Sequence, residues 1–282
     1  MANDPFPRTT IGGLSVSRLV IGTNWMNGFS HRTPAQDRNI RELNHRHPDN
    51  IADILEVFLD AGVDTILGGI GQVVLKGIRA AEDRTGRKIH IINTPRFDVA
   101  DTREGRQDAE RAFRATRDMG AEFCFPFHGM VEQLVDKESR TIRRLPDYLA
   151  MIRDLGMIPG LSAHMPEVIL YSDEQGYDVE SYLQIYNAQG FLMQLEIETV
   201  NRIIWNAKKP VLTFKPMAAG RMTPFVGLNF VWNTIRDRDL VAAGCMTPDE
   251  AAEVVEISRA AIDRRQVDIR ERGSISAMPL DW

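Results

Sequence analysis

Residues 210–244 contain the clearest indication of the fold. They read PVLTF at 210–214, GLNFVWNTIR at 227–236 and LVAAG at 240–244. The two outer pieces are short apolar runs that predict strands, and the middle piece predicts a helix. Both runs are apolar throughout rather than alternating, which is typical of parallel strands that are covered on both faces. The stretch is therefore expected to form a strand–helix–strand unit of an α/β fold.

The same alternation of strand and helix extends over the rest of the chain. The runs that predict strands lie at residues 18–22, 65–67, 88–93, 122–127, 158–162, 181–187, 210–214 and 240–244. Helical periodicity follows several of them, for example over 51–59, 103–119 and 192–203, and Thr247 is placed to cap a last helix. Eight strand–helix units in 282 residues predict a closed (β/α)8 TIM barrel that forms one domain over residues 1–282, with an irregular tail from about residue 265. A doubly wound open sheet is the alternative.

Composition and charge narrow the range of partners. The chain has 34 Lys and Arg against 39 Asp and Glu, a net charge of −5, and no long basic run, which argues against nucleic-acid binding. No apolar segment approaches the ~18 residues of a membrane helix. The two cysteines, Cys124 and Cys245, are isolated, as in proteins of a reducing cytosol. We expect a soluble cytoplasmic protein with a small-molecule substrate and no nucleic-acid or membrane partner, and a homo-oligomer is left open.

Polar residues follow the apolar runs closely, at the end of the strands where a barrel of this kind places its active site. They are Asn24, Asn93, Arg96, His128, His164, Asn187 and Lys215. His128 stands out because it directly follows the apolar run FCFPF at 123–127. Several of these residue types perform acid–base or electrostatic work in enzymes. The alternative for each is structural: an asparagine that ends a strand, a histidine bonded to backbone, or a lysine that reaches solvent.

Five short motifs occur in a telling order. They are TIGGLSVSRLVIGT at 10–23, AGVDT at 61–65, GLSAH at 160–164, QIYN at 184–187 and TFKPMAAG at 213–220. In this order they resemble the opening hairpin and first strand of the aldo/keto reductase family, the approach to its second strand, its Gly-Val-Ser-Asn segment, its Gln-x-x-Tyr-Asn strand and its Tyr-Ser-Pro-Leu-Gly-Gly turn. The similarity spans nearly the whole chain, and it implies the (β/α)8 barrel of that family.

The resemblance does not extend to the family's catalytic residues, which are an Asp, a Tyr, a Lys and a His. Leu67 stands at the Asp position, no tyrosine occurs between it and Tyr148, and the segment NTP at 93–95 lies where the Lys belongs. Only His128 matches. The family's contacts to the nicotinamide, the diphosphate and the 2′-phosphate of NADPH are replaced by Ala163, Lys215 and Met246. We therefore expect that the protein does not bind NAD(P), and nothing in these motifs requires another cofactor.

These residues suggest a non-redox enzyme, a lyase, isomerase or hydrolase, that acts on a small carbonyl- or sugar-like anionic metabolite. His128 is the candidate general acid–base, and Lys215 the residue that holds an anion or forms a Schiff base. His164 assists, or shares a divalent metal with His128, completed by a carboxylate such as Glu167 or Asp98. The candidates for substrate binding are Asn24, Asn93, Arg96, Asn187 and Arg221.

Two other functions stay open at this point. One is a divergent NAD(P)-dependent oxidoreductase that protonates its substrate through His128. The other is a catalytically inactive barrel with a regulatory or structural role. A measurement of NADPH binding distinguishes these hypotheses, because the oxidoreductase would bind NADPH and the non-redox enzyme would not.

Overall fold

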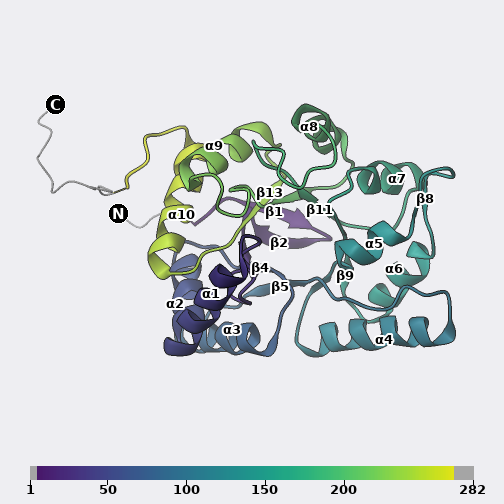
Figure 1. The fold of residues 1–282 in the computed structure, drawn as a ribbon, viewed down its shortest axis with the longest axis horizontal. Coiled ribbons are helices and arrows are strands. Elements are labelled where there is room, and N and C mark those ends of the chain that lie inside the picture. The colour runs from purple at the N-terminus through teal and green to yellow at the C-terminus, as the bar shows by residue number, and fades with distance from the viewer. Residues whose placement is uncertain (1–4, 270–282) are drawn as a thin grey trace, which may run out of the picture.

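The computed structural model, which describes residues 5–269, contains a barrel of parallel strands surrounded by helices (Figure 1). In the order in which they are hydrogen-bonded, the strands are β10 (Leu161–Ala163), β11 (Tyr182–Ile185), β12 (Val211–Phe214), β13 (Leu240–Ala243), β3 (Leu19–Gly22), β4 (Thr65–Gly68), β5 (His90–Asn93), β6 (Phe123–Cys124) and β9 (Ile158–Pro159). Only Gly160 separates β9 from β10, so the two ends of this order belong to one strand and the sheet closes. The predicted (β/α)8 barrel is confirmed, and the open-sheet alternative is wrong.

Gly160 lets the barrel close around a filled interior. The strand pairs with β6 before this glycine and with β11 after it. A Cβ atom at position 160 would lie 2.3 Å from the ring of Phe125, which is fully buried inside the barrel. The glycine therefore allows the Phe125 ring to occupy the interior at the point where the strand changes partners.

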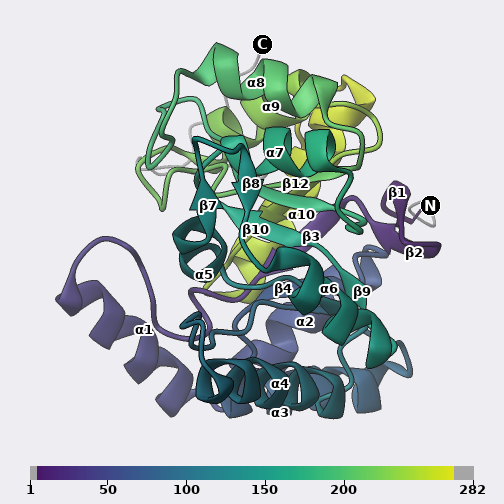
Figure 2. The same ribbon diagram turned by 90° about the vertical axis from the view of Figure 1, so that its right-hand side faces the viewer.

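Within residues 5–269, eight helices cover the outside of the barrel. They are α2 (Asn50–Asp60), α3 (Gln72–Thr85), α4 (Arg103–Asp118), α6 (Leu145–Asp154), α7 (Glu167–Gln175), α8 (Ile197–Asn206), α9 (Pro224–Thr234) and α10 (Pro248–Asp263). Two more lie in loops at one end of the barrel: α1 (Pro34–Arg46) follows β3, and α5 (His128–Gln133) follows β6. In Figure 2, α1 lies apart from the other helices. None of the described helices has the length and apolar content of a membrane span.

The expected helices are largely present, with differences at their ends. Thr247 caps α10 as predicted, because its side chain accepts a hydrogen bond from the backbone N–H of Glu250. The helix expected over 192–203 begins only at Ile197. The irregular tail expected from about residue 265 continues past residue 269, where it lies outside the described residues.

Two apolar cores hold the fold together. The larger lies between the strands and the outer helices, and the smaller fills the barrel with side chains such as Phe123 and Phe125. An antiparallel hairpin, β1 (Arg8–Ile11) and β2 (Leu14–Ser17), adds the buried Ile11 and Val16 to this inner core. The hairpin and α1 lie on opposite sides of the barrel in Figure 2, so the hairpin covers the end at which the strands begin.

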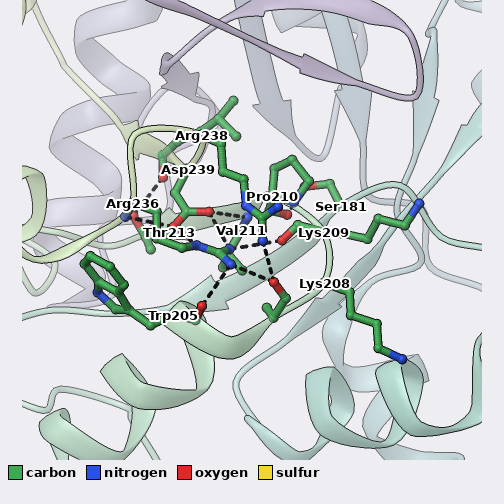
Figure 3. Close-up of polar contacts among 12 residues, drawn as sticks. Ser181, Trp205, Lys208, Lys209, Pro210, Val211, Thr213, Arg236, Arg238 and Asp239 are labelled. Carbon is green, nitrogen blue, oxygen red and sulfur yellow. Dashed lines mark hydrogen bonds and ion pairs between the residues drawn. The ribbon is translucent and has the colours of Figure 1, made fainter.

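A buried ion pair ties two loops together at that same end (Figure 3). Asp239 is 0% exposed and accepts two hydrogen bonds from the guanidinium of Arg236, at 2.8 and 2.7 Å. The carboxylate also accepts the backbone N–H groups of Arg236 and Val211, at 3.0 and 2.9 Å. The guanidinium donates in addition to the carbonyls of Ala207 and Lys209. Both charges are thus fully hydrogen-bonded, which a buried ion pair requires if it is not to destabilise the fold.

Candidate active site

A cavity of about 1040 Å³ opens where the barrel strands end. Leu67, Leu183 and Phe214 line it from the strands, and the loops that follow the strands supply the remaining wall. Six of the residues singled out from the sequence line this cavity: Asn24, Arg96, His128, His164, Lys215 and Arg221. This end of the barrel is where enzymes of this architecture place their active sites.

The two other candidates for substrate binding, Asn93 and Asn187, do not line the cavity. The side chain of Asn93 accepts the N–H of Ile70 and donates to Thr116, at 3.2 and 2.8 Å. The side chain of Asn187, which is 0% exposed, accepts the N–H of Phe191 and donates to its carbonyl, at 2.9 and 3.1 Å. Their amides hold loops and helices in place, and their role in substrate binding stays a prediction.

His128 reaches the cavity by a different route from the one predicted. The strand expected over 122–127 covers only Phe123–Cys124. Beyond it, the N–H groups of Phe125 and Phe127 donate to the carbonyls of Asn93 and Pro95, and Pro126 has no N–H to donate. Phe127 then precedes α5, and His128 is the first residue of that short helix rather than the last of a strand. Because α5 packs against β10, it brings His128 close to His164, which follows that strand.

The two histidines and one carboxylate form a compact cluster. The ring centres of His128 and His164 lie 3.9 Å apart, with the planes inclined at 68°. Nδ1 of His128 lies 3.8 Å from Oε2 of Glu132, one helical turn further along α5. In all three residues the ligand-type atoms lie within 4.8 Å of one another. Residues of the types that bind transition metals are therefore gathered at the cavity wall.

Glu132 is held in a fixed orientation by the strand beside it. Its Oε1 accepts the backbone N–H groups of His164 and Met165, at 2.5 and 3.1 Å. Burial opposes the ionisation of this carboxyl, but the neighbouring His128 and the two N–H groups outweigh burial, so the pKa of Glu132 lies below its ordinary value. Glu132 is therefore a carboxylate at neutral pH, with Oε2 on the side of His128.

The carboxylate in this cluster is not one of those expected. Glu167 accepts a hydrogen bond from the ammonium of Lys137 at 3.0 Å, and Asp98 accepts the backbone N–H of Ala100 at 2.9 Å. Neither belongs to the group of metal-binding residue types found among the described residues. Sequence reasoning missed Glu132 because α5 was not foreseen. The signal was the spacing of His128 and Glu132, since residues four apart share one face of a helix.

Lys215 places an amine in the same cavity, in surroundings that make the amine easier to deprotonate than that of an ordinary lysine. Its backbone is left-handed, with φ of 60°, and its Nζ lies 3.1 Å from Nε2 of His31 and 5.2 Å from the centre of the Phe214 ring. Burial lowers the pKa of Lys215 to about 8. Burial, and then the positive charges of His128 and Lys215, lower the pKa of His164 to about 4. Burial and Lys215 also lower the pKa of His31, so both rings are neutral at pH 7.

Two guanidinium groups are held on aromatic rings at the cavity wall. The Arg96 guanidinium lies 3.8 Å from the centre of the Phe127 ring, and that of Arg221 lies 4.0 Å from the centre of the Phe191 ring. Arg221 also donates to the carbonyl of His31 at 3.3 Å. With Lys215, these groups surround part of the cavity with positive charge, which suits an anionic ligand.

Another part of the cavity lining is acidic. Cys245, Met246, Glu250 and Glu253 line it. Glu250 accepts the backbone N–H of Met246 at 2.7 Å. Burial raises the pKa of the Cys245 thiol, so this cysteine is not a thiolate at neutral pH. The cavity thus has cationic and anionic groups on different segments of its wall.

Comparison with known proteins establishes the fold. No family model and no curated protein sequence matches the chain. A provisionally assigned aldo-keto reductase from Pseudomonas aeruginosa is 16% identical, covering 93% of this chain and 97% of its own, with a TM-score of 0.65. An aldo-keto reductase from Brucella melitensis is 12% identical, covering 92% and 98%, with a TM-score of 0.54. A truncated 3-deoxy-D-arabino-heptulosonate 7-phosphate synthase from Thermotoga maritima is 11% identical, covering 92% and 90%, with a TM-score of 0.52.

At these identities the similarity concerns the fold. The chain has an aldo/keto reductase-like barrel, as the resemblance of its motifs predicts. The same architecture occurs in reductases and in a synthase, so it does not decide between redox and non-redox chemistry.

Proposed function

We propose that the protein is a cytoplasmic, non-redox enzyme, a lyase, isomerase or hydrolase, that acts on a small anionic carbonyl- or sugar-like metabolite. One observation supports this above all: the half-buried amine of Lys215 shares a cavity with His128 and the neutral His164, beside the guanidinium groups of Arg96 and Arg221. An amine whose pKa is about 8 can take up and release a proton near neutral pH, and a neutral imidazole offers a lone pair to a proton donor.

Each group has a defined task in this proposal. Lys215 contacts the carbonyl oxygen or the anionic group of the substrate, and its lowered pKa also permits condensation with a carbonyl to an imine with loss of water. His128 transfers a proton to or from the reacting carbon or oxygen, and His164 assists it. Arg96, Arg221 and Asn24 bind the remaining polar groups of the substrate.

The residues of the cavity do not fit NADPH, the cofactor of the family that the motifs resemble. Near Met246, where the resemblance places the contact to the 2′-phosphate, the wall contains Glu250 and Glu253, whose carboxylates repel a phosphate. Ala163 offers no side-chain group to hold the nicotinamide amide, and it is 1% exposed. We therefore assign no step of the reaction to NADPH.

The proposal is tested by proton exchange, which requires no knowledge of the complete reaction. Phosphorylated sugars and 2-oxo acids are incubated with the protein in D2O, and exchange of the C–H next to the carbonyl is followed by NMR. We expect exchange with at least one of these compounds, and a reduction of ~10²–10⁴-fold in His128→Ala. The exposed His47 lies outside the cavity lining, so His47→Ala is the matched control.

The role of Lys215 is examined in the same assay. Lys215→Ala is expected to raise the substrate concentration needed for exchange, and borohydride trapping with mass spectrometry distinguishes an imine from an anion contact. Absence of exchange across the panel, together with micromolar binding of NADPH in calorimetry, would favour the oxidoreductase and overturn this proposal.

A further inference from the structure

We propose that His128, Glu132 and His164 form a binding site at the wall of the cavity for a divalent transition-metal ion. Zn²⁺ is the ion that their ligand types fit best. The ligand-type atoms of the three residues lie within 4.8 Å of one another. A tetrahedral zinc ion with ligands at about 2.0–2.1 Å separates them by roughly 3.4 Å, so the atoms need to approach one another by at most about 1.4 Å. The site does not depend on which reaction the enzyme performs.

The histidines have nitrogens that lack a partner. Nδ1 of His128 and Nε2 of His164 are buried, and neither has a hydrogen-bond partner within residues 5–269. A buried polar atom without a partner costs stability, and native proteins rarely tolerate two of them side by side. Coordination of one ion by both nitrogens removes this cost. Buried atoms without a partner also occur at His90 and Glu122, so the third residue of metal-binding type is what distinguishes this cluster.

The carboxylate is already positioned for ligation. Oε1 of Glu132 accepts two backbone N–H groups, from His164 and Met165, and these bonds fix the side chain with Oε2 toward His128. Such outer contacts to a ligand are the usual way in which proteins orient a metal site. The negative charge of Glu132 also offsets part of the charge of a divalent ion.

Two histidines and one glutamate form a ligand set that catalytic zinc sites use, with a further position left for an exogenous ligand. His128 and His164 line the cavity whereas Glu132 does not, so the open position of the ion would face the cavity. A ligand oxygen bound there would be polarised by the ion. Ligation and proton transfer are alternative roles for His128: when the ion is bound, His128 is a ligand, and Lys215 is the group that exchanges protons with the substrate.

A second His–carboxylate pair in the chain provides a comparison. Nδ1 of His90 lies 3.4 Å from Oε1 of Glu122, but the ammonium of Lys88 pairs with the same oxygen. No third residue of metal-binding type completes this pair among the described residues. We therefore expect no ion there, which makes His90→Ala a matched control.

The test uses the full chain, freed of metal by a chelator, and the ions alone as probes. Titration with Co²⁺ is followed by its visible ligand-field absorption, and binding of Zn²⁺ by calorimetry. We expect one ion per chain with micromolar or tighter affinity, a loss of at least tenfold in Glu132→Gln, and loss of the absorption band in His164→Ala. His90→Ala should bind both ions as the wild type does.

Circular dichroism checks that each variant is folded. If His164→Ala does not fold, His128→Gln is used in its place. The site would be overturned if the wild type did not bind one ion per chain. It would also be overturned if Glu132→Gln and His164→Ala bound the ions as tightly as the wild type does. Proton exchange can fail while Co²⁺ still binds, and that result rejects the proposed reaction alone.

Discussion

At the scale of single residues, Lys215 bears a charge that its surroundings disfavour. Burial lowers its pKa to about 8, whereas the ordinary value for a lysine is about 10.4. At pH 7 the amine is protonated in both the folded and the unfolded chain, so the folded state bears the cost of the buried charge. This cost disappears as the pH rises from 8 to about 10.4, because the unfolded chain then binds the additional proton.

We therefore expect Lys215→Met to stabilise the protein at pH 7, by about 1–2 kcal/mol after allowance for solvent screening. The advantage should shrink as the pH rises toward 10. The facing rings of His31 and His164 have lowered pKa values and do not titrate in this window. Urea unfolding at pH 7 and pH 10 measures the effect, with the exposed Lys76→Met as the control. A variant less stable than the wild type at pH 7 would contradict the expectation.

Position at a strand end predicts which residues gather at the mouth of a barrel, but not which of them face the cavity. Asn24, Arg96 and Lys215 line the cavity as expected, whereas Asn93 turns its amide toward Thr116 on α4. Successive residues of a strand point to opposite faces. A shift of one residue in the strand boundary therefore decides whether a side chain faces the cavity or the outer helices. Apolar runs do not fix the boundary that closely.

At the scale of elements, the strands of the barrel were predictable and two helices were not. Strands buried on both faces leave a clear apolar signature in the sequence. Helix α1 is mostly polar, and α5 has only six residues, so neither gives a strong periodic signal. The omission of α5 mattered for function, because that helix brings Glu132 beneath His128. Helix α1 and the loop before it add further cavity residues, including Phe29 and His31.

The loops at the opposite end of the barrel bear on stability rather than on chemistry. Asp239→Asn leaves the buried guanidinium of Arg236 without its counter-charge, and we expect a loss of about 3–5 kcal/mol in the free energy of unfolding. Asp237→Asn, at an exposed position two residues away, should change stability by less than about 0.5 kcal/mol. Urea denaturation compares the two variants, and a loss below about 1 kcal/mol in Asp239→Asn would show that the network is dispensable.

At the scale of the whole molecule, closure of the barrel depends on one position without a side chain. Gly160→Ala forces a methyl group against the Phe125 ring, and we expect a loss of about 1–3 kcal/mol from overpacking. Because the clash is with one ring, Phe125→Leu should recover part of this loss in the double variant. Gly69→Ala is the control, because a Cβ atom at position 69 meets no atom within 4 Å. Equal losses in the single and double variants would place the strain elsewhere.

The hairpin of β1 and β2 has a kinetic consequence for the molecule as a whole. Within residues 5–269, Ile11 and Val16 close the barrel where the strands begin, and the cavity opens at the opposite end. The product therefore leaves through the same opening by which the next substrate molecule arrives. Product that remains in the cavity occupies the place that the substrate must enter, so we expect the product to inhibit competitively with the substrate.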